Sequence, residues 1–181
     1  MKYIIQFSIL LCMGACCSCG QTIVGSTITT NTTFIRFDPN PALLDEISHL
    51  APKAQSEYLV FQIKTNIQGD NLEINWRKAT AIRLLARSSV SNKVEILIDN
   101  ISFMDEKHRN FPAYYAFQEI GESAVAPLLE FAISSTDYPA VEGAGGTIRA
   151  ILGPQKYQEL LDANKERMSV PTLQLLSTTI E

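Results

Sequence analysis

Histidine and acidic side chains are the first residues to consider for chemistry, because general-base catalysis and metal binding both use them. The 181-residue chain contains two histidines, His49 and His108. His108 lies in the charged stretch "MDEKHRN" together with Asp105 and Glu106, all three able to ligate a metal ion. Neighbouring residues of one loop rarely converge on an ion without ligands from elsewhere, so we expect a solvated loop here and predict no metal and no cofactor. We expect His49 at a surface or helix end.

The glycine-rich stretch "EGAGGTIR", residues 142–149, is a second place for chemistry, because backbone N–H groups at a helix start can bind an anion. It lacks the Lys-Ser/Thr ending of a phosphate-binding loop. We therefore favour a packing role, in which Gly143, Gly145 and Gly146 allow two helical hairpins to approach closely. The sequence also has no nucleophile-elbow serine and no distinctive pair of carboxylates. We predict no catalytic residue and no enzyme.

The aromatic run "FPAYYAF", residues 111–117, is more suggestive of binding. Phe117 fits the apolar face of a helix, whereas Tyr114 and Tyr115 flank that face and cannot both lie on it. Exposed tyrosines often anchor protein partners. The alternative is that both rings pack against the neighbouring helices. Tyr114 and Tyr115 are our candidate binding residues.

A stretch of two apolar patterns, "AFQEIGESAVAPLLEFA" at residues 116–132, predicts the elements that position these side chains. Both patterns have helical spacing. The first comprises Ala113, Ala116, Phe117 and Ile120, and the second Val125, Leu128, Leu129 and Ala132. We expect Gly121 to end the first helix in a left-handed conformation, Ser123 to cap the second, and Pro127 to lie in its first turn.

The same hairpin pattern recurs along the chain. Residues 116–132 align without a gap on "IRAILGPQKYQELLDAN", residues 148–164, so that Gly121 falls on Gly153. Weaker copies precede them, and four hairpins with turns near residues 51, 87–92, 121 and 153 cover residues 41–165. Pro52 and Pro154 each follow a turn, where proline is favoured as the first helical residue. The C-terminal "VPTLQLLSTTI" predicts a last short helix.

The pattern A-x-x-x-I-G…A-V-x-P-L-L within residues 116–129 resembles HEAT-like repeats, which build right-handed α-solenoids in scaffold and adaptor proteins. The resemblance implies an all-α domain over residues 41–181, a short α-solenoid of about four hairpins. Ala51 and Ala86 stand in place of the turn glycine, and Arg149 in place of the Phe117-type core residue. An irregular helical bundle, also all-α, is the alternative.

All four cysteines fall in residues 1–19, which begin with Lys2, continue with an apolar run and end in small residues. This pattern is typical of an export signal, and the run is too short to span a bilayer. Its "MGAC" resembles the lipobox of bacterial lipoproteins, which implies lipidation of Cys16. Cys19 is an alternative lipid site. Plain cleavage after Ala15 would instead give a secreted soluble protein.

The rest of the chain limits the possible partners. Without cysteine after residue 19, it has no disulfide framework and no catalytic thiol. Residues 20–40 are rich in Thr, Ser and Asn and predict a tether, with a strand or hairpin as the alternative. The net charge is −4 and no Lys/Arg run exceeds two residues, which argues against a nucleic-acid partner.

Together these features predict a functional class without naming a substrate. We expect an exported, lipid-anchored scaffold that binds a protein partner at the cell envelope and touches the membrane only through its lipid. One alternative is an immunity protein that blocks a toxin, which an acidic helical surface and an envelope address would suit. Another is an enzyme accessory protein, because some HEAT-like proteins are associated with lyase and hydroxylase chemistry.

Overall fold

The computed structural model describes residues 37–65 and 71–178, so the predicted signal, Cys16, Cys19 and most of the predicted tether lie outside the described residues. Within those ranges the protein is all-α, as predicted, and forms no strand. The α-helices are α1 (Pro41–Ser48), α2 (Pro52–Thr65), α3 (Leu72–Leu85), α4 (Lys93–Ile98), α5 (Pro112–Ile120), α6 (Val125–Ser134), α7 (Tyr138–Leu152), α8 (Pro154–Asn164) and α9 (Val170–Thr178). Two 3-10 helices, η1 (Gly121–Ala124) and η2 (Lys165–Arg167), join some of them.

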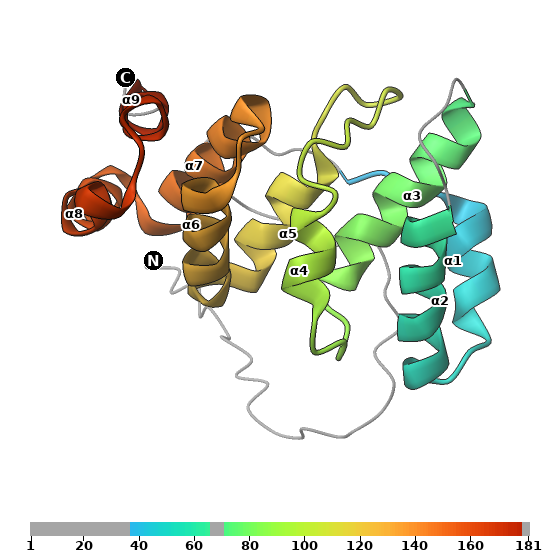
Figure 1. Ribbon diagram of the computed structural model, residues 1–181. Helices are drawn as coiled ribbons and strands as arrows, with labels where there is room; N and C mark the ends of the chain where they lie inside the picture. Colours follow the sequence, from blue (N-terminus) through green and yellow to red (C-terminus); the bar gives the residue numbers. More distant parts are fainter. Residues whose placement is uncertain (1–36, 66–70, 179–181) are drawn as a thin grey trace, which may run out of the picture.

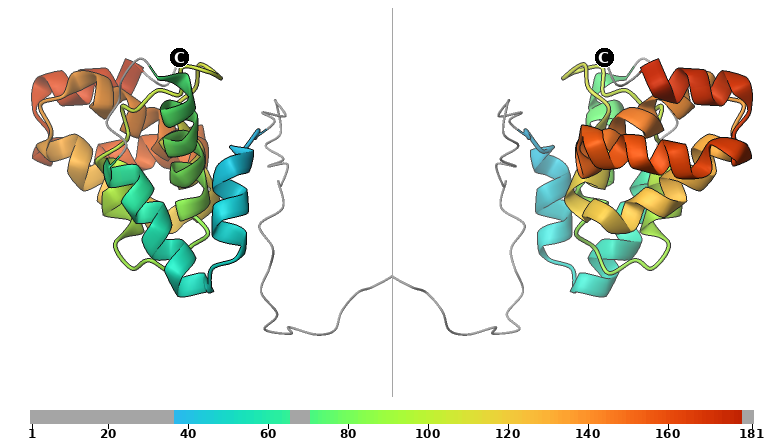
Figure 2. Two further views of the ribbon diagram at one scale, coloured as in Figure 1. Left: turned by 90° about the vertical axis from the view of Figure 1, so that its right-hand side faces the viewer. Right: turned by 90° about the vertical axis from the view of Figure 1, so that its left-hand side faces the viewer.

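Successive helices form hairpins that pack against one another in chain order (Figure 1). The turns between α1 and α2, α3 and α4, α5 and α6, and α7 and α8 lie at the four predicted places. Helix α3 contacts α1, α2 and α5, and α7 contacts α5, α6, α8 and α9. Helices α1 and α2 lie at one end of the molecule, and α8 and α9 at the other (Figure 2). The HEAT-like assignment of these hairpins stays a prediction.

The helix ends follow mostly from local sequence. Pro52 and Pro154 are the first residues of α2 and α8, as predicted. Gly121 and Gly153 end α5 and α7 with φ angles of 76° and 80°, a conformation that glycine adopts without strain. The predicted cap at Ser123 is wrong: η1 occupies this turn, and α6 begins after Ala124 with no side-chain cap.

The glycine-rich stretch lies inside α7 and not before a helix start. Its N–H groups therefore belong to the interior of a helix, which contradicts an anion-binding loop. The packing role that we favoured finds no support at two of the three glycines, Gly143 and Gly146, whereas Gly145 is buried. A Cβ atom on Gly143 would come no closer than 4.0 Å to Ile101, and one on Gly146 would meet nothing within 4 Å. The structure gives no reason for glycine at these two positions.

Helix α3 forms the centre of the core. Residues 79–85 are all buried, because α1, α2 and α5 surround this part of the helix. Apolar side chains fill most of this contact, yet Thr80 and Arg83 are buried there as well. Buried polar groups need partners, and these two contact the segment that precedes α1.

That segment, residues 37–40, was predicted to belong to the tether. In the structure it lies along α3, and we call it the strap. The backbone N–H of Asn40 donates to Thr80 Oγ1 at 2.9 Å, and the Asn40 side chain caps α1 at the N–H of Leu43. The folded body therefore starts at least four residues before the predicted boundary.

Candidate functional site

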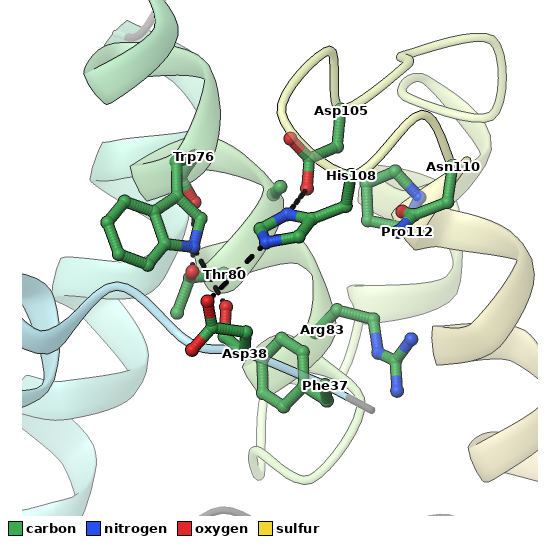
Figure 3. A pocket seen from close by; sticks show the side chains of 10 residues that line it. Phe37, Asp38, Trp76, Thr80, Arg83, Asp105, His108, Asn110 and Pro112 are labelled. Atoms are coloured by element: carbon green, nitrogen blue, oxygen red, sulfur yellow. Dashed lines mark hydrogen bonds and ion pairs between the residues drawn. The ribbon is translucent and has the colours of Figure 1, made fainter. Parts of the chain in front are cut away.

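A small cavity of about 20 Å³ lies where the strap, α3 and the connection between α4 and α5 meet (Figure 3). Phe37 and Asp38 come from the strap, Trp76 and Arg83 from α3, and His108 from the connection. A space of this size holds about one water molecule and no organic substrate. The surrounding side chains therefore interact mainly with one another.

His108 lies between two carboxylates. Its Nδ1 is 2.6 Å from Asp105 Oδ2, and its Nε2 is 3.6 Å from Asp38 Oδ2 (Figure 3). Asp105 is only 3% exposed and also accepts a hydrogen bond from the backbone N–H of Lys107. The expectation of a solvated loop is thus wrong for Asp105 and His108, although Glu106 is exposed.

A histidine between two carboxylates offers some of the ligands of a metal site and the oriented imidazole of a catalytic base. An acid that orients a histidine is common in hydrolases, but there the second ring nitrogen faces a nucleophile. Here it faces Asp38, and the nearby Thr80 hydroxyl already donates to the Trp76 carbonyl. Among the described residues, no group of three His, Cys, Asp or Glu side chains could hold a metal ion.

Trp76 and Lys107 complete the attachment of the strap. The Trp76 indole N–H donates to the Asp38 carbonyl at 2.8 Å. The Lys107 ammonium lies over the indole ring and 3.8 Å from Asp38 Oδ2. Asp38 thus contacts α3 through its backbone and the α4–α5 connection through its side chain. We call this cluster of Asp38, Trp76, Asp105, Lys107 and His108 the strap latch.

Arg83 is the buried cation beside the latch. It is 5% exposed, and its guanidinium carbon lies 4.7 Å from the Phe37 ring centroid and 4.6 Å from that of Tyr115. Its Nε has no hydrogen-bond partner among the residues that the structure describes. Burial lowers the pKa of Arg83 to about 10, an effect that the charge of Glu119 partly opposes. The two rings replace the water that the cation has lost.

The structure places the two candidate tyrosines side by side on α5. Tyr114 and Tyr115 are both half-buried, and their rings meet edge to face at 5.2 Å. The Tyr115 ring contacts Arg83, and burial raises the pKa of its hydroxyl. The strongly exposed aromatic residue of this run is Phe111, at 48%. Sequence reasoning missed it, although its position just before Pro112 places it outside the apolar face of the helix.

Phe111 belongs to a larger set of exposed apolar side chains. Helices α3, α5 and α7 all begin at the upper edge of the molecule in Figure 1, where the connections between hairpins lie. Among the described residues, six of the seven large exposed apolar side chains belong to these connections or to helix starts that follow them. They are Leu72, Ile74, Met104, Phe111, Tyr138 and Val170. We call these six residues the apolar edge.

Exposed apolar residues are ordinary when they are scattered. The apolar edge is not scattered in this way. An exposed apolar residue occurs in the connection after each of the first three hairpins or in the first turn of the next helix, and again at the start of α9. The seventh residue, Phe61, is 55% exposed and lies within α2, neither in a connection nor at a helix start. Two of the six, Phe111 and Tyr138, are aromatic, and exposed aromatic side chains are suited to a protein partner.

Comparison of the chain with protein-family models, with curated proteins and with solved structures gives no match. The arrangement of its own residues is therefore the basis for a function.

The burial of Arg83 leads to a stability prediction. We expect Arg83→Met to change the free energy of unfolding by less than about 1 kcal/mol, because removal of a buried charge offsets the loss of two ring contacts. Arg83→Ala should cost about 2–3 kcal/mol, because it also leaves a cavity between Phe37 and Tyr115. Urea denaturation of both variants measures the difference. If Arg83→Met loses as much unfolding free energy as Arg83→Ala, the guanidinium must form stabilising interactions beyond its contacts with the two rings.

Proposed function

We propose that this protein is an exported helical scaffold that binds a protein partner through the apolar edge. The recurrence of exposed apolar residues at the connections between hairpins and at the helix starts that follow them is the observation that carries the proposal. Removal of such side chains from water favours association, and the aromatic rings of Phe111 and Tyr138 suit the centre of an interface. The resemblance of residues 116–129 to HEAT-like repeats supports the same class of function.

The partner that fits is elongated and carries apolar side chains of its own. The helices whose starts carry these residues follow one another along the stack, from α3 to α9 (Figure 1). A compact ligand would meet only one or two of its residues. An extended segment or a helix of the partner would contact several at once, as peptide-binding repeat proteins do in general.

The location of the protein is a second part of the proposal. We propose that the chain is held at the envelope by a lipid on Cys16, with Cys19 as the alternative. In the described part, none of the helices has the length and apolar character needed to cross a membrane. The strap would connect such a lipid anchor to the helical domain. It is attached to α3 by the hydrogen bond from the Trp76 indole N–H to the Asp38 carbonyl.

The lipid proposal predicts how the protein fractionates. In a bacterial host that processes lipoproteins, we expect the full chain in the membrane fraction and Cys16→Ser in the soluble fraction, because one acyl-bearing residue supplies the attachment. Cys19→Ser is the matched control and should stay with the membrane. Mass spectrometry of the N-terminal peptide identifies the acylated residue. Soluble recovery of both the unchanged chain and Cys19→Ser would contradict lipidation at Cys16.

The apolar edge predicts the effect of surface variants on partner capture. We expect Phe111→Ser combined with Tyr138→Ser to weaken capture of an envelope partner at least about tenfold, because hot-spot aromatics each contribute about 1–2 kcal/mol or more. The control is Phe61→Ser, which removes an equally exposed ring outside the edge. Quantitative mass spectrometry after affinity capture compares the variants. Equal loss in the control, or no loss in the edge variant, would refute the proposal.

A further inference from the structure

A larger cleft of about 410 Å³ shares none of its lining residues with the strap latch. It opens between residues 98–103, which are the last residue of α4 and the segment after it, and the connection from α6 to α7. Helix α3 contributes Lys78. This volume lies in the usual range of small-ligand sites. Ile101, Phe103 and Phe131 give it apolar walls, so the cleft is suited to an apolar body of a few carbon atoms.

Lys78 is the cation of this cleft. It is half-buried, and its ammonium lies 4.8 Å from the Phe103 ring centroid. It forms no ion pair with any residue that the structure describes. Burial lowers the pKa of this amine, which reflects the cost of holding its charge away from water. A bound anion would offset that cost.

Two acidic residues also line the cleft and limit the kind of anion. The Asp137 carboxylate is already used as the cap of α7, where it accepts from the N–H of Ala140 at 3.3 Å. Asp99 is exposed. One ammonium neutralises one negative charge, so a doubly charged phosphate would keep an unneutralised charge close to the carboxylates of Asp99 and Asp137. A single carboxylate has the charge that Lys78 alone can neutralise.

We propose that this cleft binds a carboxylate joined to a small apolar body, with Lys78 on the carboxylate and Phe103 and Phe131 against the apolar part. The site differs from the apolar edge in its chemistry and does not depend on the proposed scaffold function. The carboxylate belongs either to a free aliphatic acid or to the C-terminal end of a peptide. Both sources offer the same charge and the same apolar contact.

A pair of probes that differ only in charge tests the proposal. N-acetyl-leucine carries a carboxylate, and N-acetyl-leucinamide has nearly the same shape without it. We expect titration of the purified full chain, followed by backbone NMR shifts, to show saturable shifts at residues 98–103 and 135–140. The amide should bind about tenfold more weakly, the usual effect of one hydrogen bond to a charged group.

Variants connect this difference to Lys78. Lys78→Met keeps the unbranched apolar stem and loses the charge, and we expect it to bind the acid and the amide equally. Lys53→Met, a control on the exposed surface of α2, should keep the tenfold preference. Thermal unfolding followed by circular dichroism verifies that both variants fold, and Lys78→Gln serves as the second variant if Lys78→Met does not. Equal binding of the two probes to the unchanged protein, or shifts that do not saturate, would overturn the proposal.

The two sources of the carboxylate are separated with the same measurement. Octanoate represents a free aliphatic acid, and N-acetyl-alanyl-leucine represents a peptide end. Tighter binding of octanoate assigns the cleft to a free acid, and tighter binding of the dipeptide assigns it to a polypeptide end. Failure of both to compete with N-acetyl-leucine would overturn the proposal.

Discussion

The structure depends on one constraint: a hairpin of two short helices cannot bury its own apolar face. Each hairpin therefore completes its core against the next, and α3 shows the result most clearly, with residues 79–85 buried among three other helices. Because the helix faces are used for this packing, most of the large exposed apolar side chains lie in the connections between hairpins and in the first turns of the helices that follow. The apolar edge is in this sense a consequence of how the core is formed.

Polar contacts fix the position of the strap, which leads into the helical domain along α3. The strap is bonded to α3 by Asn40 and Trp76, and Asp38 also reaches His108 on a distant connection. Contacts of this kind contribute little net stability, because desolvation opposes the buried ones, such as Asn40 with Thr80, and solvent screens the exposed ones, such as Asp38 with His108. Their role here is to select one position for the strap. Arg83 adds to this selection, since it contacts Phe37 on one side and Tyr115 on the other.

The sequence predicted those features that depend on local chemistry. Gly121 and the proline that begins α8 act through their own backbone, so the turns could be placed from a few residues. The cap at Ser123 failed because a 3-10 helix fills that turn. The strap latch could not be predicted, because Asp38 and His108 are distant in sequence and only the packing of α3 brings them together. The exposure of Phe111 had a signal in the sequence, because this residue precedes Pro112 and lies outside the apolar face of α5.

The central claim is that partner contacts lie on the apolar edge, and crosslinking in living cells tests it most directly. A photoreactive amino acid would replace Phe111 in one variant and Phe61 in another, with residues 1–36 unchanged. We predict that the first variant forms a discrete covalent adduct with an envelope protein after illumination and that the second does not. Adducts of the same kind from both positions, or from Phe61 alone, would contradict the claim.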